Sequence, residues 1–391
     1  MFLTVLSVSQ RVSGTLMLAF TLPCLSISGI ATALLQGGSI AMVAAFPALY
    51  MQAVMSGMAL AGLLVSVSSF LACFFSTSLN KDVSADFNFI CGFVLLSLCC
   101  LSFCLLPYIP FARFFLNSKE NEFRDEDDTA EVTLLCAENG ESRPNDHQRR
   151  SQESLPLLDE LKQSLIRKGS QNLEPGRSSV DEGNTFRKLK LAVSRTLGIL
   201  SKIKWHFAGI VVTFAITLSV FPGIIALVVS HVNTARPPMA SPPAGRFFGD
   251  CFVPFLFVLF NTFDLLGRLA GGFWTKKRPN ARLIFVLVCL RAALVPLICM
   301  CNIVSRNPFT RQIENGWALP VIFKSDYSTF GLVSVLGFTN GLPASIIMMH
   351  APGELSIDDI EIGGGLMAWA IVLGVSSGSS LSLLFSGTLS Y

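Results

Sequence analysis

Charged residues are scarce in this chain of 391 residues, because they make up 14% of it while apolar residues make up 51%. A water-soluble domain carries more charge and cannot hide so much apolar surface from water. The net charge is only +3, and no cluster of Lys and Arg with interleaved aromatic residues occurs. We therefore exclude a nucleic-acid-binding protein, and we predict that lipid is the solvent for most of the chain.

Patterns of metal ligands are also missing. The four histidines are scattered along the chain, and the eleven cysteines include no CxxC pair. Most of the cysteines lie inside apolar blocks, where they are typical small core residues. We therefore predict neither a metal site nor a cofactor.

The chain does contain a series of apolar blocks, each about as long as the roughly 20 residues that a helix needs to cross a bilayer. These blocks predict eight spans, at Ser13–Phe46, Leu49–Ser76, Phe87–Ile109, Trp205–Val229, Phe247–Thr275, Leu283–Ile303, Ser328–His350 and Gly363–Ser386. The fold class that follows is an all-α, polytopic membrane protein.

One long polar segment interrupts the series. Residues 111–204 hold 16 of the 29 Lys and Arg and 16 of the 26 Asp and Glu, and such a segment cannot bury a core. We predict three parts: a membrane half at 1–110 with three helices, a disordered loop at 111–204, and a membrane half at 205–391 with five helices. Within the loop, 155–166 and 185–203 have the pattern of short amphipathic helices. The loop ends in a basic stretch and the connector at 276–282 carries four basic residues, which places both in the cytoplasm.

Ionisable residues deep in a predicted span are costly, and three draw attention: Asp264, Arg268 and Arg291. Asp264 and Arg268 lie four residues apart on one helical face, and Asn261 joins the same stripe. The pair can read a polar substrate or can tie helices together, and the spacing leaves both interpretations open. Arg291 fits a cap or a pairing near a helix boundary. No second carboxylate accompanies Asp264 at lipid depth, so an intramembrane aspartyl protease, or any other enzyme, is not predicted.

Several stretches, taken in order, resemble the equilibrative nucleoside transporter family. FNTFDLLGR at 260–268 resembles the signature of that family's eighth helix. Residues 33–62 resemble its fourth and fifth helices, and FPGI at 221–224, RAALVPLICMCN at 291–302 and GFTNGLPAS at 337–345 resemble its seventh, ninth and tenth. The chain is identified as a member of this family.

The resemblance implies a major-facilitator-like helical bundle of six plus five helices, in which two halves rock about a site near the midplane. This chain resembles the family only from about the end of its third helix. We therefore expect about eight transmembrane helices, an incomplete six-plus-five architecture that lacks the first three.

The resemblance also implies roles for individual residues. Gln36 stands where the family has a glutamine that faces the nucleobase. Asp264 and Arg268 stand where a charged pair reads the ribose, with Asn261 beside them. We expect Phe247–Thr275 to form a single helix that places these three residues toward a central cavity shared with the first predicted span.

A second group of residues is expected to serve packing. Gly57 and Gly62 match small positions that let helices approach closely. Pro222, Pro296 and Asn340 are expected to shape helix bends or helix packing.

Two functions follow as hypotheses. The first is facilitative transport of nucleosides or nucleobases by alternating access, with nucleosides and the lipid bilayer as partners. The alternative is a truncated, non-transporting membrane protein that acts through partners. We expect an integral, multi-pass protein of the plasma membrane, with endosomes or lysosomes as the alternative because the loop contains ESLPLL at 153–158, which fits a sorting pattern.

Overall fold

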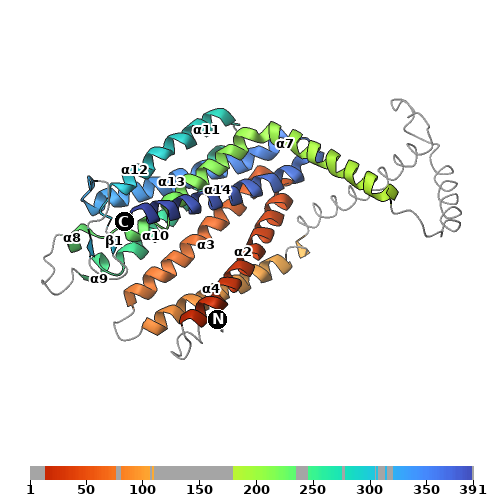
Figure 1. Ribbon diagram of the computed structural model, residues 1–391. Helices are drawn as coiled ribbons and strands as arrows, with labels where there is room; N and C mark the ends of the chain where they lie inside the picture. The colour runs from red at the N-terminus through yellow and green to blue at the C-terminus, as the bar shows by residue number, and fades with distance from the viewer. Residues whose placement is uncertain are drawn as a thin grey trace, which may run out of the picture. The chain divides into compact units, whose positions relative to one another are not determined.

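The computed structural model describes residues 14–75, 81–105, 108–109, 179–234, 245–274, 278–303, 305–306, 313–314 and 320–389. Its long helices are α2 (Gly14–Ala44), α3 (Ala48–Phe75), α4 (Lys81–Leu105), α7 (Ser179–Val220), α10 (Phe252–Gly271), α13 (Asp326–His350) and α14 (Ile360–Leu389) (Figure 1). A further span consists of α11 (Ala281–Leu290), the 3-10 turn η4 (Arg291–Ala293) and α12 (Leu294–Cys299).

The remaining elements are short. They are α8 (His231–Thr234), α9 (Gly245–Phe248), the 3-10 turns η2 (Ile225–Leu227), η3 (Gly272–Trp274), η5 (Ala351–Glu354) and η6 (Ile357–Asp359), and the strands β1 (Ser305–Arg306) and β2 (Ile313–Glu314). The two strands have two residues each and pair antiparallel.

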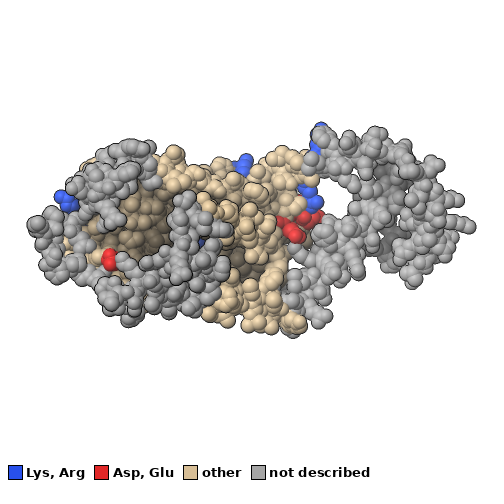
Figure 2. All heavy atoms as spheres, turned by 60° about the horizontal axis from the view of Figure 1, so that its bottom comes forward, with Lys and Arg blue, Asp and Glu red and all other residues tan. Residues whose placement is uncertain are grey.

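Seven helical segments among the described residues are long and apolar enough to cross a membrane: α2, α3, α7, α10, α11–α12, α13 and α14. They confirm the polytopic helical fold. The predicted third span is helix α4, whose described apolar part, Gly92–Leu105, is shorter than a full span, so its crossing stays a prediction. Large apolar side chains such as Leu34, Phe103 and Leu290 are exposed on the surface of the helices, as expected for helices that face lipid. On the face seen in Figure 2 the described surface carries few charged residues.

The boundary between the loop and the fourth span is corrected. We expected a short separate helix at 185–203 and a new span from Trp205, but one continuous helix, α7, begins at Ser179 and runs through both. The reason is a buried stripe at helical spacing that crosses the expected boundary, formed by Ile199, Ile203, His206 and Ile210. Residues 111–178, the rest of the predicted loop, lie outside the described residues.

The predicted single helix at Phe247–Thr275 is also corrected. The structure divides this stretch into α9, a turn at residues 249–251, α10 and η3. Pro254 has no backbone N–H, and proline is best tolerated in the first turn of a helix. Because α10 starts at Phe252, Pro254 falls in that first turn, and Gly249 lies in the break before it.

Two clusters of buried apolar side chains hold the helices together. The larger one draws on α2, α3, α7, α11, α13 and α14, and the smaller one on α7, α10, α12 and α13. Helices of both predicted membrane halves thus pack in one unit, residues 1–99 with 195–391, while residues 100–194 form a second unit.

Helices α10 and α13 approach each other at backbone distance. Gly337 and Gly341 lie four residues apart on α13 and face α10, while Gly267 on α10 faces α13. A methyl group at Gly341 would overlap the carbonyl oxygen of Asp264 and would lie 2.9 Å from the amide nitrogen of Arg268. Small residues at such spacing are typical of membrane helices that touch through their backbones. This contact fixes the position of Asp264 relative to α13.

Candidate functional site

The charged pair of α10 is buried and joined. The Nε and Nη2 atoms of Arg268 each lie 3.0 Å from Oδ2 of Asp264. The exposed fraction is 3% for Asp264 and 4% for Arg268. One turn of helix brings the two side chains together, as their spacing of four residues predicts. Such a pair in lipid surroundings needs further hydrogen bonds to offset its desolvation.

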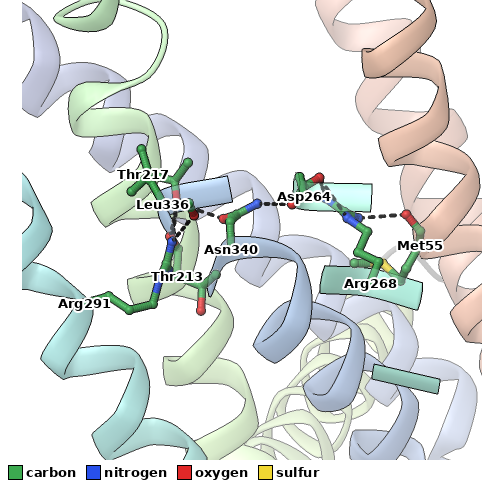
Figure 3. Close-up of polar contacts among 8 residues, drawn as sticks. All are labelled: Met55, Thr213, Thr217, Asp264, Arg268, Arg291, Leu336 and Asn340. Atoms are coloured by element: carbon green, nitrogen blue, oxygen red, sulfur yellow. Dashed lines mark hydrogen bonds and ion pairs between the residues drawn. The ribbon is translucent and has the colours of Figure 1, made fainter. Parts of the chain in front are cut away.

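Asn340 of α13 supplies the next contact. Its Nδ2 donates to Oδ1 of Asp264 at 2.7 Å, and its Oδ1 accepts from the hydroxyl of Thr217 of α7 at 2.8 Å. That hydroxyl in turn accepts from Nη2 of Arg291 at 2.8 Å. Figure 3 shows the resulting chain of polar contacts, which runs from Arg291 through Thr217, Asn340 and Asp264 to Arg268. We call these five residues the polar network.

Arg291 is the other end of the polar network and donates four hydrogen bonds. Besides Thr217, it donates to the carbonyl oxygen of Thr213 at 3.1 Å, to the hydroxyl of Thr339 at 3.1 Å and to the carbonyl oxygen of Leu336 at 3.4 Å. It stands where α11 gives way to the 3-10 turn η4. The polar network therefore holds two guanidinium groups and one carboxylate. The carboxylate of Asp264 pairs directly with Arg268, whereas the hydrogen-bond partners of Arg291 are neutral oxygens.

Arg268 also reaches across to the other predicted membrane half. Its Nη1 donates to the carbonyl oxygen of Met55 on α3 at 2.9 Å. Nearby, the side-chain amide of Gln52 lies 3.3 Å from the carbonyl oxygen of Leu269 and 3.5 Å from that of Arg268. These contacts begin what we call the α3–α10 seam, the line along which the two antiparallel helices touch.

Asn261 lies farther along the same seam. Its amide donates to the hydroxyl of Ser66 on α3 at 2.7 Å. A methyl group at Gly62 would lie 2.6 Å from Oδ1 of Asn261, so this glycine leaves room for the amide. Asn261 thus shares a face with Asp264 and Arg268, as predicted, but it contacts α3 and not the polar network.

Gln36 is not brought to the charged pair. It is half-buried on α2, which packs mainly on α14, and none of the hydrogen bonds of the polar network reaches it. We expected α10 to face a cavity shared with the first predicted span, but α10 packs mainly on α13 and on the second predicted span, α3. The role of Gln36 stays a prediction.

The residues predicted to serve packing differ in outcome. A methyl group at Gly57 would meet no described atom within 4 Å, whereas one at Gly62 would meet Asn261. Helix α7 ends at Val220, just before Pro222, and Pro296 lies in α12 directly after the 3-10 turn η4. Asn340 does more than shape a bend, because it bridges Asp264 and Thr217.

Sequence reasoning missed Thr217 and Gln52. Thr213 and Thr217 lie four residues apart inside an apolar span, which is a signal that could have pointed to a polar partner on that face. Gln52 is a polar residue near the start of the second span. Among the described residues, no group of three His, Cys, Asp or Glu side chains could hold a metal ion.

A cavity of about 480 Å³ lies where α11 begins, away from the polar network. Its lining includes Lys202, Lys204, Arg278 and Arg282, with Glu354 as the acidic member. These basic residues belong to the two segments whose positive charge predicts the cytoplasmic side of the membrane. The carboxyl end of α10 leads into the basic connector at 276–282 and is therefore predicted to lie on the cytoplasmic side. The amino end of α10 is then predicted to face outside.

Apolar helices that enclose one charged network define a class of protein: an integral, multi-pass membrane protein built like a transporter. The profile of the family described as nucleoside transporter matches residues 23–387. The chain therefore belongs to the nucleoside transporter family, which is a family of transporters and not of enzymes.

Individual relatives agree with this assignment. The chain is 28% identical to equilibrative nucleoside transporter 2 of Homo sapiens over 361 residues, which cover 92% of this chain and 69% of that protein. It is 29% identical to the protein of the same name from Mus musculus, over 91% of this chain and 69% of that protein. It is 26% identical to equilibrative nucleoside transporter 1 of Rattus norvegicus, over 90% of this chain and 65% of that protein.

Proposed function

We propose that this protein carries nucleosides across a membrane by facilitative transport. The family and the names of the relatives support this function. The single observation that carries it at the level of the site is the ion pair of Asp264 and Arg268, which is buried at lipid depth and shared between two sets of helices. Intramembrane charges of this kind mark substrate paths.

The chemistry of the pair suits a sugar. The carboxylate of Asp264 accepts hydrogen bonds from hydroxyl groups, and the guanidinium of Arg268 donates to their oxygens while it offsets the negative charge. In this structure both side chains are satisfied by protein atoms. A ribose must therefore replace existing partners, and the contact of Arg268 with the Met55 carbonyl is the one whose loss leaves the polar network intact.

This exchange couples binding to movement. Thr217, Asn340, Arg291 and Asp264 all belong to the predicted carboxyl-terminal half, so their contacts are kept when the two halves rock. The Arg268–Met55 contact and the rest of the α3–α10 seam join the two halves and must loosen. When the seam opens, Arg268 loses its hydrogen bond to the Met55 carbonyl. A sugar oxygen that accepts from Arg268 in its place replaces this lost bond, so that substrate binding favours the opening that alternating access requires.

Uptake experiments test this function. We expect cells without endogenous nucleoside carriers to take up labelled uridine saturably when they express the chain. Loss of the 2′- and 3′-hydroxyls in 2′,3′-dideoxyuridine removes hydrogen bonds to charged groups worth about 1.5–3 kcal/mol each, so its uptake efficiency should be at least about tenfold lower. Uptake equal to that of mock cells would contradict transport, and equal uptake of both compounds would contradict sugar recognition.

Gln36 is proposed to face the nucleobase, because a planar amide can both donate to and accept from a base edge. The change Gln36→Ala should remove neutral hydrogen bonds of roughly 1 kcal/mol each. We expect uridine and adenosine both to be transported, with a changed ratio of their uptake. Gln52→Ala serves as the comparison for the uptake ratio, since the hydrogen bonds of Gln52 go to backbone carbonyls of α10. An unchanged purine to pyrimidine ratio in Gln36→Ala would remove Gln36 from the site.

We propose the plasma membrane as the location. Surface biotinylation of intact cells tests it, and labelling of the chain to the same extent as a resident surface protein is the expected result. Labelling only after permeabilisation would favour the endosomal or lysosomal alternative.

A further inference from the structure

Two cysteines meet at the end of the α3–α10 seam. The thiol of Cys251 donates to the sulfur of Cys73, with the two sulfurs 3.0 Å apart. Cys73 lies near the carboxyl end of α3, and Cys251 is the residue before the first turn of α10. A disulfide has a sulfur–sulfur distance of about 2.05 Å. The two sulfurs therefore need to move closer by only about 1 Å to form a bond.

The two cysteines differ in access. Cys251 is fully buried, whereas Cys73 is half-buried. Aromatic rings pack around the contact: Phe70 and Phe255 lie 5.9 Å apart between ring centres, and Phe247 and Phe255 lie 5.0 Å apart. These rings hold the ends of α3 and α10 together.

The side of the membrane matters for thiol chemistry. The basic connector at 276–282 follows α10, which predicts that α10 ends at the cytoplasmic side and begins at the outer side. Cys73 and Cys251 then face the compartment in which disulfides form and persist. The Met55 contact of Arg268 lies toward the opposite end of the same seam.

We propose that Cys73 and Cys251 are a thiol–disulfide modification site that closes the outer end of the α3–α10 seam. The oxidant is a low-molecular-weight disulfide. The thiolate of the more accessible Cys73 attacks it and displaces one small thiol, forming a mixed disulfide. The thiolate of Cys251 then attacks the Cys73 sulfur and displaces the second small thiol. Two protein thiols are oxidised, one small disulfide is reduced to two thiols, and the two protons leave with them.

The bond joins one predicted membrane half to the other. Because the halves must separate on the outer side for a substrate to enter from there, the disulfide holds the carrier closed to the outside. This consequence rests on the proposed function, whereas formation of the bond does not.

A gel assay tests the bond. A protease site placed in the polar loop, after residue 145 of the full chain, separates Cys73 from Cys251 on cleavage. Membranes treated with oxidised glutathione and then cleaved should give a single linked species without reductant and two fragments with it. Cys73→Ser and Cys251→Ser should each give two fragments under both conditions, while Cys289→Ser, which removes an exposed cysteine of α11, should behave like the unchanged chain.

Two fragments from the oxidised, unchanged chain would overturn the site, and so would a linked species that survives in Cys73→Ser. Uptake of labelled uridine tests the closure. We expect it to be lost on oxidation, restored by reductant, and insensitive to oxidation in Cys251→Ser. A linked chain that transports as fast as the reduced one would overturn the closure. A chain that never transports contradicts the proposed function alone, since the gel result stands without transport.

Discussion

The change Asp264→Asn is expected to abolish uridine uptake and to lower the amount of protein at the cell surface. Asparagine keeps the shape and can still accept from Asn340, but it removes the carboxylate that balances Arg268 and lies in the same polar network as Arg291. Breaking a buried ion pair by removing one partner costs about 3–5 kcal/mol, which is a large part of a total stability of about 5–15 kcal/mol. Surface biotinylation together with uptake measures both effects.

A double change separates stability from recognition. Asp264→Asn with Arg268→Gln leaves a neutral pair that can still hydrogen-bond, so surface abundance should recover. Uptake should not recover, because neither amide supplies the charge that strengthens bonds to the sugar hydroxyls. If Asp264→Asn alone reaches normal abundance and transports normally, the role of the pair in reading the sugar is wrong.

The change Gly341→Ala is expected to disrupt the packing of α10 on α13. The added methyl group meets the carbonyl oxygen of Asp264 and the amide nitrogen of Arg268, and backbone atoms cannot move aside as a flexible side chain can. Overpacking typically costs about 1–3 kcal/mol and occasionally more. Because the two helices must separate, we expect the upper part of this range, seen as a lower melting temperature of the detergent-solubilised protein and as lost uptake.

The same helix offers a matched control. Gly331 also lies on α13, but a methyl group there would meet no described atom within 4 Å. Gly331→Ala should therefore leave the melting temperature unchanged or raise it slightly, since alanine favours the helix. Equal behaviour of the two variants would show that α10 and α13 do not touch through Gly341.

The sequence predicts much of the fold, because lipid imposes simple rules. Blocks of about 20 apolar residues must be helices, and the spacing of Asp264 and Arg268 places them on one face and in one ion pair. The helix period also explains why Asn261 shares their stripe. The continuity of α7 was missed because the change from polar to apolar sequence at residue 204 hides a buried stripe that crosses it. The start of α10 could have been read from Pro254.

The partners of the pair could not be predicted by the same rules. Periodicity tells which face of a helix is polar, but it does not tell which neighbour meets that face. Asn340 and Thr217 come from helices that are distant in sequence, and both helices are apolar on most sides. Gln36 was chosen from a resemblance, while the glutamine found beside Arg268 is Gln52, one helix further along the chain. Only the packing of α3 and α13 on α10 distinguishes these positions.

Transport of uridine by purified protein in liposomes tests the central claim most directly. Labelled uridine should equilibrate into vesicles that contain the unchanged chain, without any ion gradient, faster than into protein-free vesicles. The double variant Asp264→Asn with Arg268→Gln, reconstituted in equal amount and with a comparable melting temperature, should equilibrate at the protein-free rate. The account would be contradicted if uridine entered vesicles with the unchanged chain no faster than protein-free vesicles. It would also be contradicted if uridine entered vesicles with the double variant as fast as vesicles with the unchanged chain.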